Sequence, residues 1–245
     1  MYFEYELLSE KGIRSENQDN ALVTTNNKGN ALIVLADGMG GHIGGKTASS
    51  IAVRYLKELF KSIDLDSMNE SEINKWCEQS VDAIRNEMIL FAKNNPRIDD
   101  MGTTLVFALV GKDKVYFTNI GDSRAYIIQN KKVRLVTKDQ NYINSIDDPV
   151  ERKTVEMTIV GQYLVSSLGP NKQTKIDNYV ELLDYDTTII LTSDGIHKFI
   201  PEKLLHKIII SNTSNLSIMM NKLIRSAKKY NSTDNMTGVV LRSER

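Results

Sequence analysis

The sequence predicts an α+β fold in which antiparallel strands are covered by helices. Two segments, about 48–60 and 70–93, carry apolar residues at helical spacing with charged residues on the opposite face. From Gly102 onward, four apolar runs follow one another with only a few residues between them. Successive strands without crossover helices pair antiparallel, which argues against a doubly wound parallel sheet.

The first half of the chain is predicted to place its two helices between strands. Apolar residues alternate with glutamates from Phe3 to Leu7, which predicts a half-buried strand ending near Ser9, and residues 12–20 predict a loop. The uninterrupted apolar run 31–36 predicts a buried strand. Pro96 then helps to end the second helix.

The second half is predicted to begin with an antiparallel meander. Its strands are expected at 103–110, 114–120, 124–129 and 132–136. Residues 137–165 are polar and weakly patterned, which predicts a surface excursion that could cover a site. A buried strand at 188–193, a helix at 216–227 and a strand at 236–241 complete the prediction.

Composition limits the classes of function. The 245 residues are 41% hydrophobic and 25% charged, and no linker or repeat divides them, so we expect a single domain spanning 1–245. The 31 basic and 31 acidic residues cancel, so no overall field favours nucleic acid as a partner.

The single cysteine, Cys77, excludes an internal disulfide. No signal-like segment opens the chain and no apolar run approaches the roughly 20 residues that span a bilayer, so we expect a cytoplasmic protein without membrane insertion.

The segment 36–45 is the first candidate site. Asp37 follows the buried strand, and five of the next eight residues are glycines. Glycine permits tight turns and close approach of the backbone to an ion or an anion, so the segment predicts a metal or a phosphate site. The residues Gly44-Gly45-Lys46-Thr47 lack the spacing of a nucleotide-binding loop, which favours the metal.

Three further acids occupy comparable positions: Asp194 after a buried strand, Asp234 before one, and Asp122 between two strands. Carboxylates that converge on strand ends raise one another's pKa, and a hard cation relieves that repulsion. Oxygen ligands favour Mg²⁺ or Mn²⁺ over zinc, and two such ions suit metal-assisted phosphate hydrolysis with Arg14 holding the phosphate. A single Asp-Gly after a strand is usually a turn, and a single arginine such as Arg14 is usually a solvated surface charge. The metal site is predicted from the acids and Arg14 taken together.

The order of the motifs carries a family resemblance. They are Arg14-x-x-Asn17-Gln18-Asp19, Asp37-Gly38-Met39-Gly40-Gly41-His42, Gly102-Thr103-Thr104, Gly121-Asp122-Ser123-Arg124, Ser193-Asp194-Gly195 and Asp234-Asn235. From about residue 5 to 242 the chain resembles the metal-dependent Ser/Thr protein phosphatases of the 2C type, in their short bacterial form. The resemblance implies a four-layer αββα sandwich, in which two antiparallel sheets pack face to face between helices, with a binuclear metal site at one end.

The resemblance also implies roles for the candidate residues. Asp37 would bridge two ions, Mn²⁺ or Mg²⁺, and the Gly38 carbonyl would bind one of them. Asp194 and Asp234 would bind the other, and Arg14 would contact the substrate phosphate. A bridging hydroxide would attack phosphorus in line, without a phosphoenzyme.

Weaker roles follow from the same resemblance. Asp122, together with Asp194, resembles a third and weaker metal position. Gln18 and Asp19 would support the second ion through a bound water molecule or by contacting the residues that bind it. The excursion at 137–165 matches the variable flap that borders the site and influences substrate choice.

Several positions depart from the family pattern. Gln18 stands where many relatives carry Glu, which removes one negative charge near the second ion. Met39 stands where animal members carry a His proposed as general acid, and His42 is a nearby candidate for that role. The residues Asp139-Gln140-Asn141 and Ser166-Ser167-Leu168-Gly169 lack a His or Ser and an Arg that are common around the flap.

Three functional interpretations follow. The first is a Mn²⁺- or Mg²⁺-dependent phosphatase, expected to be a monomer, that acts on phosphoserine and phosphothreonine in proteins and opposes a Ser/Thr kinase. The second, from Gln18 and the altered flap surroundings, is a catalytically weakened phosphoprotein-binding regulatory module. Retention of Asp37, Asp194 and Asp234 argues against it. The third, a regulator phosphatase of the anti-sigma type with one narrow substrate, shares the chemistry of the first and differs in its partner.

Overall fold

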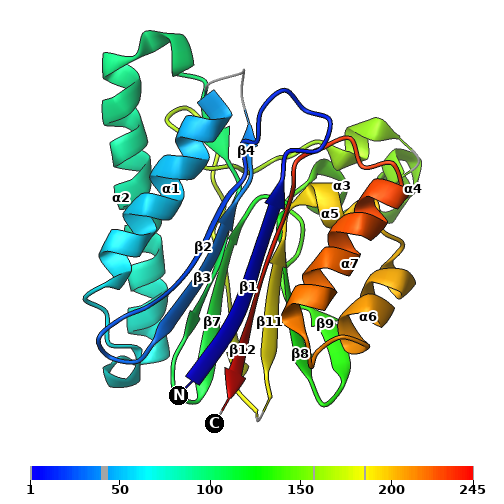
Figure 1. Cartoon of the computed structure of the whole chain (residues 1–245). Coiled ribbons are helices and arrows are strands. Elements are labelled where there is room, and N and C mark those ends of the chain that lie inside the picture. Colours follow the sequence, from blue (N-terminus) through cyan, green and yellow to red (C-terminus); the bar gives the residue numbers. More distant parts are fainter. Residues whose placement is uncertain (1, 40–43, 157, 185, 245) are drawn as a thin grey trace.

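Two antiparallel sheets form the centre of the molecule and helices cover both of their outer faces (Figure 1). The computed structural model describes residues 2–39, 44–156, 158–184 and 186–244. The first sheet has the order β10 (Asp177–Leu182), β7 (Lys114–Ile120), β6 (Leu105–Val110), β3 (Ala31–Ala36), β2 (Asn20–Thr25). The second has the order β1 (Tyr2–Glu10), β12 (Met236–Glu244), β11 (Thr188–Thr192), β8 (Arg124–Gln129), β9 (Lys132–Leu135).

Two pairs of helices form the outer layers. The first sheet is covered by α1 (Gly44–Phe60) and α2 (Glu70–Asn94), and the second by α6 (Glu202–Ile210) and α7 (Leu216–Lys229). A capping box begins α2, because the Asn69 side chain accepts from the Glu72 N–H while the Glu72 carboxylate accepts from the Asn69 N–H. The predicted four-layer αββα sandwich is confirmed.

Successive side chains of a strand point to opposite faces of the sheet, and both faces of the first sheet are buried, which explains why a strand such as β3 has a continuous apolar sequence. Along β3, Leu32 and Val34 face α1 and α2, whereas Ile33 and Leu35 face the second sheet. Every residue of β3 is therefore buried, on one face or the other. The cluster between the sheets includes Phe117 from the first and other apolar side chains from the second.

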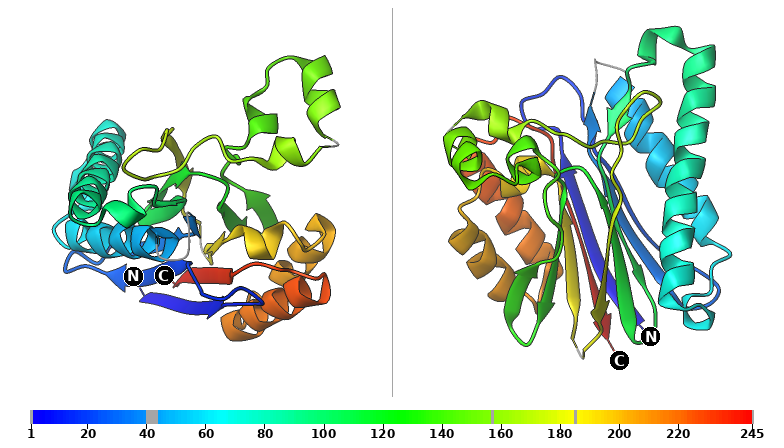
Figure 2. Two further views of the ribbon diagram at one scale, coloured as in Figure 1. Left: turned by 90° about the horizontal axis from the view of Figure 1, so that it is seen from above. Right: turned by 180° about the vertical axis from the view of Figure 1, so that it is seen from behind.

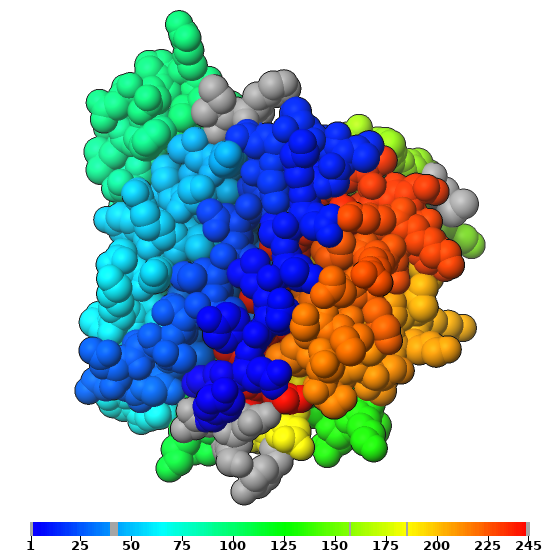
Figure 3. All heavy atoms as spheres, in the orientation of Figure 1, coloured from blue at the N-terminus to red at the C-terminus, as the bar shows by residue number. Residues whose placement is uncertain are grey.

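One edge of the second sheet is open. Figure 3 shows β1 in dark blue crossing the surface between the helices of the two outer layers. Tyr2 and Tyr5 on this strand are exposed, which matches the half-buried strand that the sequence predicts. Within the described ranges, no helix has both the length and the apolar character that a bilayer crossing requires.

The predicted meander is wrong at its centre. The strands β6 and β7 pair, and so do β8 and β9, but β7 and β8 belong to different sheets. Gly121, with φ of 101°, turns the chain from one sheet to the other. The predicted strand at 103–110 is also interrupted at Thr104, so that β5 (Gly102–Thr103) pairs with β4 (Gly38–Met39) beside the sandwich.

Residues 137–165 leave the sandwich and return to it. They contain α3 (Tyr142–Ser145), α4 (Pro149–Glu156) and the short 3₁₀ turn η3 (Ile159–Gln162), and Figure 2 shows this lime-green segment projecting from the sheets. A bridge between Asn141 and Leu164 closes its base. The two helices were not predicted because neither has a buried side chain: Val150 is exposed, and Ile143 and Val155 are only half-buried, so neither helix has a core-facing stripe.

Three more short elements complete the chain. They are η1 (Leu65–Ser67), η2 (Pro96–Ile98) and α5 (Asp194–His197). Of these, α5 begins at a candidate site residue directly after β11, so its first turn fixes the direction of the Asp194 side chain.

Candidate active site

One pocket gathers almost all of the predicted site residues. Its lining includes both residues of β4, which lies at the end of the sandwich remote from both termini (Figure 1). Its volume is about 520 Å³. Its described lining is Arg14, Ser15, Glu16, Gln18, Asp37, Gly38, Met39, Thr104, Asp122, Gln162, Tyr163, Leu164, Asp194, Lys198, Asp234 and Asn235. Segments up to 220 positions apart in sequence therefore meet in one place, as shown by the contact between Arg14 and Asp234.

The backbone of Asp37 is held rigidly at the end of β3. Its N–H donates to Thr104 Oγ1 at 3.0 Å, and its carbonyl accepts from the Thr104 N–H at 2.8 Å and from Thr103 Oγ1 at 2.9 Å. The hydroxyl of Thr104 is within 2.8 Å of Ser123 Oγ. The sequence singled out the Gly-Thr-Thr motif only through family resemblance, and the structure gives it a role in positioning Asp37.

Crowded carboxylates surround Asp37. Burial raises the pKa of the Asp37 carboxyl well above its usual range, and the charges of Asp19 and Asp194 raise it further. Burial also raises the pKa of Asp19 to about 6, although hydrogen bonds from hydroxyls such as Ser193, at 2.9 Å from Oδ2, oppose that shift. Asp19 Oδ1 is buried and receives no hydrogen bond within the described residues. The negative charge of this group is thus incompletely compensated by the protein.

The first turn of α5, which carries Asp194, is in direct contact with the loop that carries Asp234. A Cβ added at Gly195 would lie 1.9 Å from the carbonyl oxygen of Asn235, so only glycine allows the two backbones to approach this closely. Asp234 Oδ2 accepts from the Arg14 guanidinium at 2.7 Å, and Asp194 Oδ2 is 3.0 Å from Lys198 Nζ.

Asn235 holds the loop that carries Arg14. Its Nδ2 donates to the carbonyls of Lys11 at 2.8 Å and Glu16 at 3.0 Å, and its Oδ1 accepts from the Gln18 N–H at 2.9 Å. The Arg14 side chain is 55% exposed at the pocket, and its hydrogen bond with Asp234 raises the guanidinium pKa. Arg14 therefore stays protonated and places a positive charge at the rim of the pocket.

Gly38 is enclosed by backbone. A Cβ at this position would lie 2.3 Å from the carbonyl oxygen of Gly45 and 2.6 Å from that of Gln18. The Gln18 side chain lies against Gly45, because a Cβ there would be 2.4 Å from Gln18 Oε1. The structure therefore places Gln18 in the wall of the pocket, beside Gly38.

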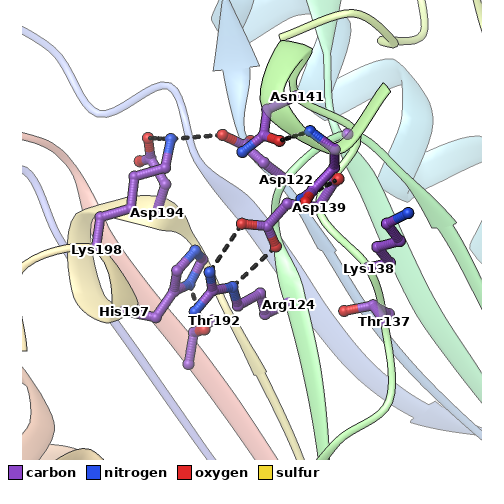
Figure 4. A network of polar contacts seen from close by, with 12 residues as sticks. Asp122, Arg124, Thr137, Lys138, Asp139, Asn141, Thr192, Asp194, His197 and Lys198 are labelled. Atoms are coloured by element: carbon purple, nitrogen blue, oxygen red, sulfur yellow. Dashed lines mark hydrogen bonds and ion pairs between the residues drawn. The ribbon is translucent and has the colours of Figure 1, made fainter. Parts of the chain in front are cut away.

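Lys198 is the pocket residue that sequence reasoning missed. Its ammonium lies 2.5 Å from Asp122 Oδ2 and 3.0 Å from Asp194 Oδ2, between the two acids predicted to form a third metal position (Figure 4). Burial lowers the pKa of Lys198, but the carboxylates of Asp194 and Asp122 outweigh burial and the net pKa is raised. Burial raises the pKa of Asp122, and Lys198 opposes that shift.

The histidines do not reach the described lining of the pocket. His42 lies outside the described residues, whereas Met39 is one of the lining residues. His197 is buried behind the site, where Nδ1 is 2.8 Å from Thr192 Oγ1, and burial holds its pKa well below the usual range. No described histidine is therefore placed to protonate a leaving group directly.

The set of donors fits hard cations. Within the part of the chain that the structure describes, no three His, Cys, Asp or Glu side chains already converge as a ligand cluster. Asp194 and Asp234 instead form ion pairs with Lys198 and Arg14. The pocket nevertheless offers carboxylate and carbonyl oxygens and no cysteine or histidine among its described lining. Oxygen donors with uncompensated negative charge, such as Asp19 Oδ1, suit Mg²⁺ or Mn²⁺.

Comparisons with known proteins agree with this arrangement. The family model described as Protein phosphatase 2C matches residues 12–237. The Serine/threonine phosphatase stp of Listeria welshimeri serovar 6b is 31% identical over 227 residues, covering 92% of this chain and 89% of that protein. The structure of the S. agalactiae serine/threonine phosphatase has a TM-score of 0.86 at 27% identity, covering 99% of this chain and 100% of that one.

A more distant structure shares the fold. The catalytic domain of the serine threonine protein phosphatase PstP, solved in complex with 2 manganese ions, has a TM-score of 0.81 at 22% identity and covers 99% of each chain. The family resemblance is thus confirmed over residues 12–237, which contain all of the motifs. The chain belongs to the protein phosphatase 2C family and is a protein-serine/threonine phosphatase.

Proposed function

We propose that this phosphatase uses two Mn²⁺ or Mg²⁺ ions to hydrolyse phosphoserine and phosphothreonine in proteins by direct attack of water on phosphorus. The observation that carries the proposal is the pocket lined by Asp37, Asp194 and Asp234, with the charge of Asp19 close to Asp37. Bound divalent ions supply a water of lowered pKa and neutralise charge on the phosphoryl oxygens.

Each residue has a distinct part in the proposal. Asp37 would bridge the ions and the Gly38 carbonyl would bind one of them, while Asp194 and Asp234 would bind the other. The contacts from Thr103 and Thr104 support this role for Asp37, because a ligand on a fixed backbone loses little freedom when an ion binds. Gln18 and Asp19 would act through water or by orienting the ligands.

The lining of the pocket also supports hydrolysis without a covalent phosphoenzyme on sulfur or imidazole. No cysteine or histidine is among its described residues, and Cys77 is buried in the core between α2 and the first sheet. Arg14 would hold the substrate phosphate through two parallel N–H···O bonds, the geometry in which guanidinium groups bind phosphate.

The substrate is proposed to be a phosphorylated protein, which makes this enzyme the counterpart of a Ser/Thr kinase in the cytoplasm. Gln162, Tyr163 and Leu164 bring the flap to the edge of the pocket, and the Tyr163 side chain is 59% exposed. A partly apolar rim of this kind supports contact with residues that flank a phosphorylated side chain.

Hydrolysis of a phosphothreonine peptide tests the proposal. Phosphate release is expected with Mn²⁺, is expected to fall to background with excess chelator, and is expected to return when Mn²⁺ is restored. Circular dichroism in each condition confirms that the chain is folded. A folded protein that binds the peptide but shows no metal-dependent release would support the regulatory-module interpretation and contradict the proposal.

Arg14→Ala is expected to weaken substrate binding more than catalysis. Loss of charge-assisted hydrogen bonds to phosphate is worth about 1.5–3 kcal/mol, which predicts a rise in KM on the order of 10- to 100-fold. The matched control is Arg225→Ala, which removes an exposed arginine on α7 and should leave both constants unchanged. An unchanged KM in the Arg14 variant would show that this side chain does not hold the phosphate.

A further inference from the structure

A lysine ammonium lies between the two acids that the family resemblance assigns to a third metal ion. Lys198 Nζ lies 2.5 Å from Asp122 Oδ2 and 3.0 Å from Asp194 Oδ2, and dashed lines in Figure 4 mark both contacts. These are the two carboxylates whose pairing resembles the family's weaker metal position. The two acids therefore already share one cation, which the chain itself supplies.

The lysine is fixed by its place in the fold. Its backbone N–H donates to the Asp194 carbonyl at 3.0 Å, at the end of α5, so Lys198 and Asp194 lie one helical turn apart on the same side. The Lys198 side chain is 27% exposed and that of Asp122 is 6% exposed. The ammonium therefore reaches inward from α5 to a carboxylate on the turn between β7 and β8.

An ammonium and a divalent ion cannot share this place. A Mg²⁺ or Mn²⁺ ion that used the same oxygens would lie about 2.1 Å from each of them. The space between those oxygens already holds Lys198 Nζ, and two cations in contact repel strongly where water is partly excluded. The residues present thus fit a third metal ion poorly.

We propose that Lys198 replaces a third metal ion in this phosphatase, so that the site holds two exchangeable ions and one tethered ammonium. Lys198 is a positioning residue in this scheme: it neutralises Asp122 and holds Asp194 on α5 in line with the other ligands. The proposal rests on the two-ion site described above. It predicts a metal stoichiometry that differs between the natural chain and its Lys198 variants.

Isothermal titration calorimetry with Mn²⁺ on the whole chain tests the stoichiometry. We expect two ions per natural chain and a third, weaker ion in Lys198→Ala or Lys198→Asp, because both variants open the space between Asp122 and Asp194. The matched control is Lys203→Ala, on the exposed face of α6, which should bind two ions. Three ions in the natural chain, or two in both Lys198 variants, would overturn the proposal.

Thermal melting separates this inference from the two-ion proposal. In chelator, Lys198→Met should lower the melting temperature by about 5 °C, because it leaves Asp122 buried without its cation. In millimolar Mn²⁺ the difference should shrink, since an ion then fills the same place. An equal loss in both conditions would indicate packing alone and overturn the proposal. Absence of Mn²⁺ binding by the natural chain would contradict the two-ion proposal itself. A Lys198→Met variant that is as stable as the natural chain in chelator would overturn the proposed role of the ammonium.

Discussion

Asp37→Asn is expected to lower kcat on the order of 10³-fold or more, because it removes the charge proposed to hold both ions. The same change should not weaken the fold. Burial and the neighbouring carboxylates raise the pKa of Asp37, so in the absence of metal the charged form of this side chain costs folding free energy. A neutral side chain of the same shape relieves that cost, and the variant should melt in chelator at or above the temperature of the natural chain.

Kinetics and melting in parallel check this prediction. Asp82→Asn is the matched control, since Asp82 is exposed on α2 and the same change there should alter neither rate nor melting temperature. The combination of lost turnover and retained stability separates a functional carboxylate from a structural one. Near-normal turnover in the Asp37 variant would contradict the proposed metal site.

Gly195→Ala should damage the site through the backbone. Its new Cβ would lie 1.9 Å from the carbonyl oxygen of Asn235, and neither backbone can yield without moving Asp194 away from Asp234. Forced expansion of a packed contact costs about 1–3 kcal/mol, which corresponds to a fall in melting temperature of about 3–10 °C for a chain of this size. Turnover should fall as well, because Asn235 also fixes the loop that carries Arg14.

The control for this substitution is Gly111→Ala, at the turn between β6 and β7. The nearest atom to a Cβ there is Asp66 Oδ1 at 3.2 Å, the end of a side chain that can move. Differential scanning calorimetry and phosphopeptide kinetics should show a much smaller loss than for Gly195→Ala. Equal losses in the two variants would contradict the argument that the contact between α5 and the Asn235 loop shapes the site.

The elements that could be predicted from the sequence are those whose apolar residues recur with a clear helical or strand spacing. The run 31–36 and the amphipathic stripes of α1 and α2 were predicted because their burial is complete or strictly one-sided. The strands β2 and β10 were not predicted, since they lie at the two edges of the first sheet, are only half-buried and give a weak pattern. Periodicity also does not say which sheet a strand joins, and for that reason the crossing at Gly121 was missed.

The same distinction applies to the site. Asp37 and Asp194 could be proposed from sequence because each follows a buried run and precedes glycine, which places a carboxylate at the end of a strand. Lys198 gave no such signal. Its partner Asp122 is 76 positions away, and their meeting depends on how α5 and the turn between the two sheets pack together. Contacts of that kind follow from tertiary structure alone.

Anomalous diffraction at the manganese edge, from crystals of the natural chain grown with Mn²⁺, tests the two-ion site most directly. The account predicts two anomalous peaks in the pocket, both in contact with Asp37 and one of them also with Asp194 and Asp234. It predicts no peak between Asp122 and Asp194, where Lys198 should remain in place. A pocket without peaks at Asp37 would contradict the account.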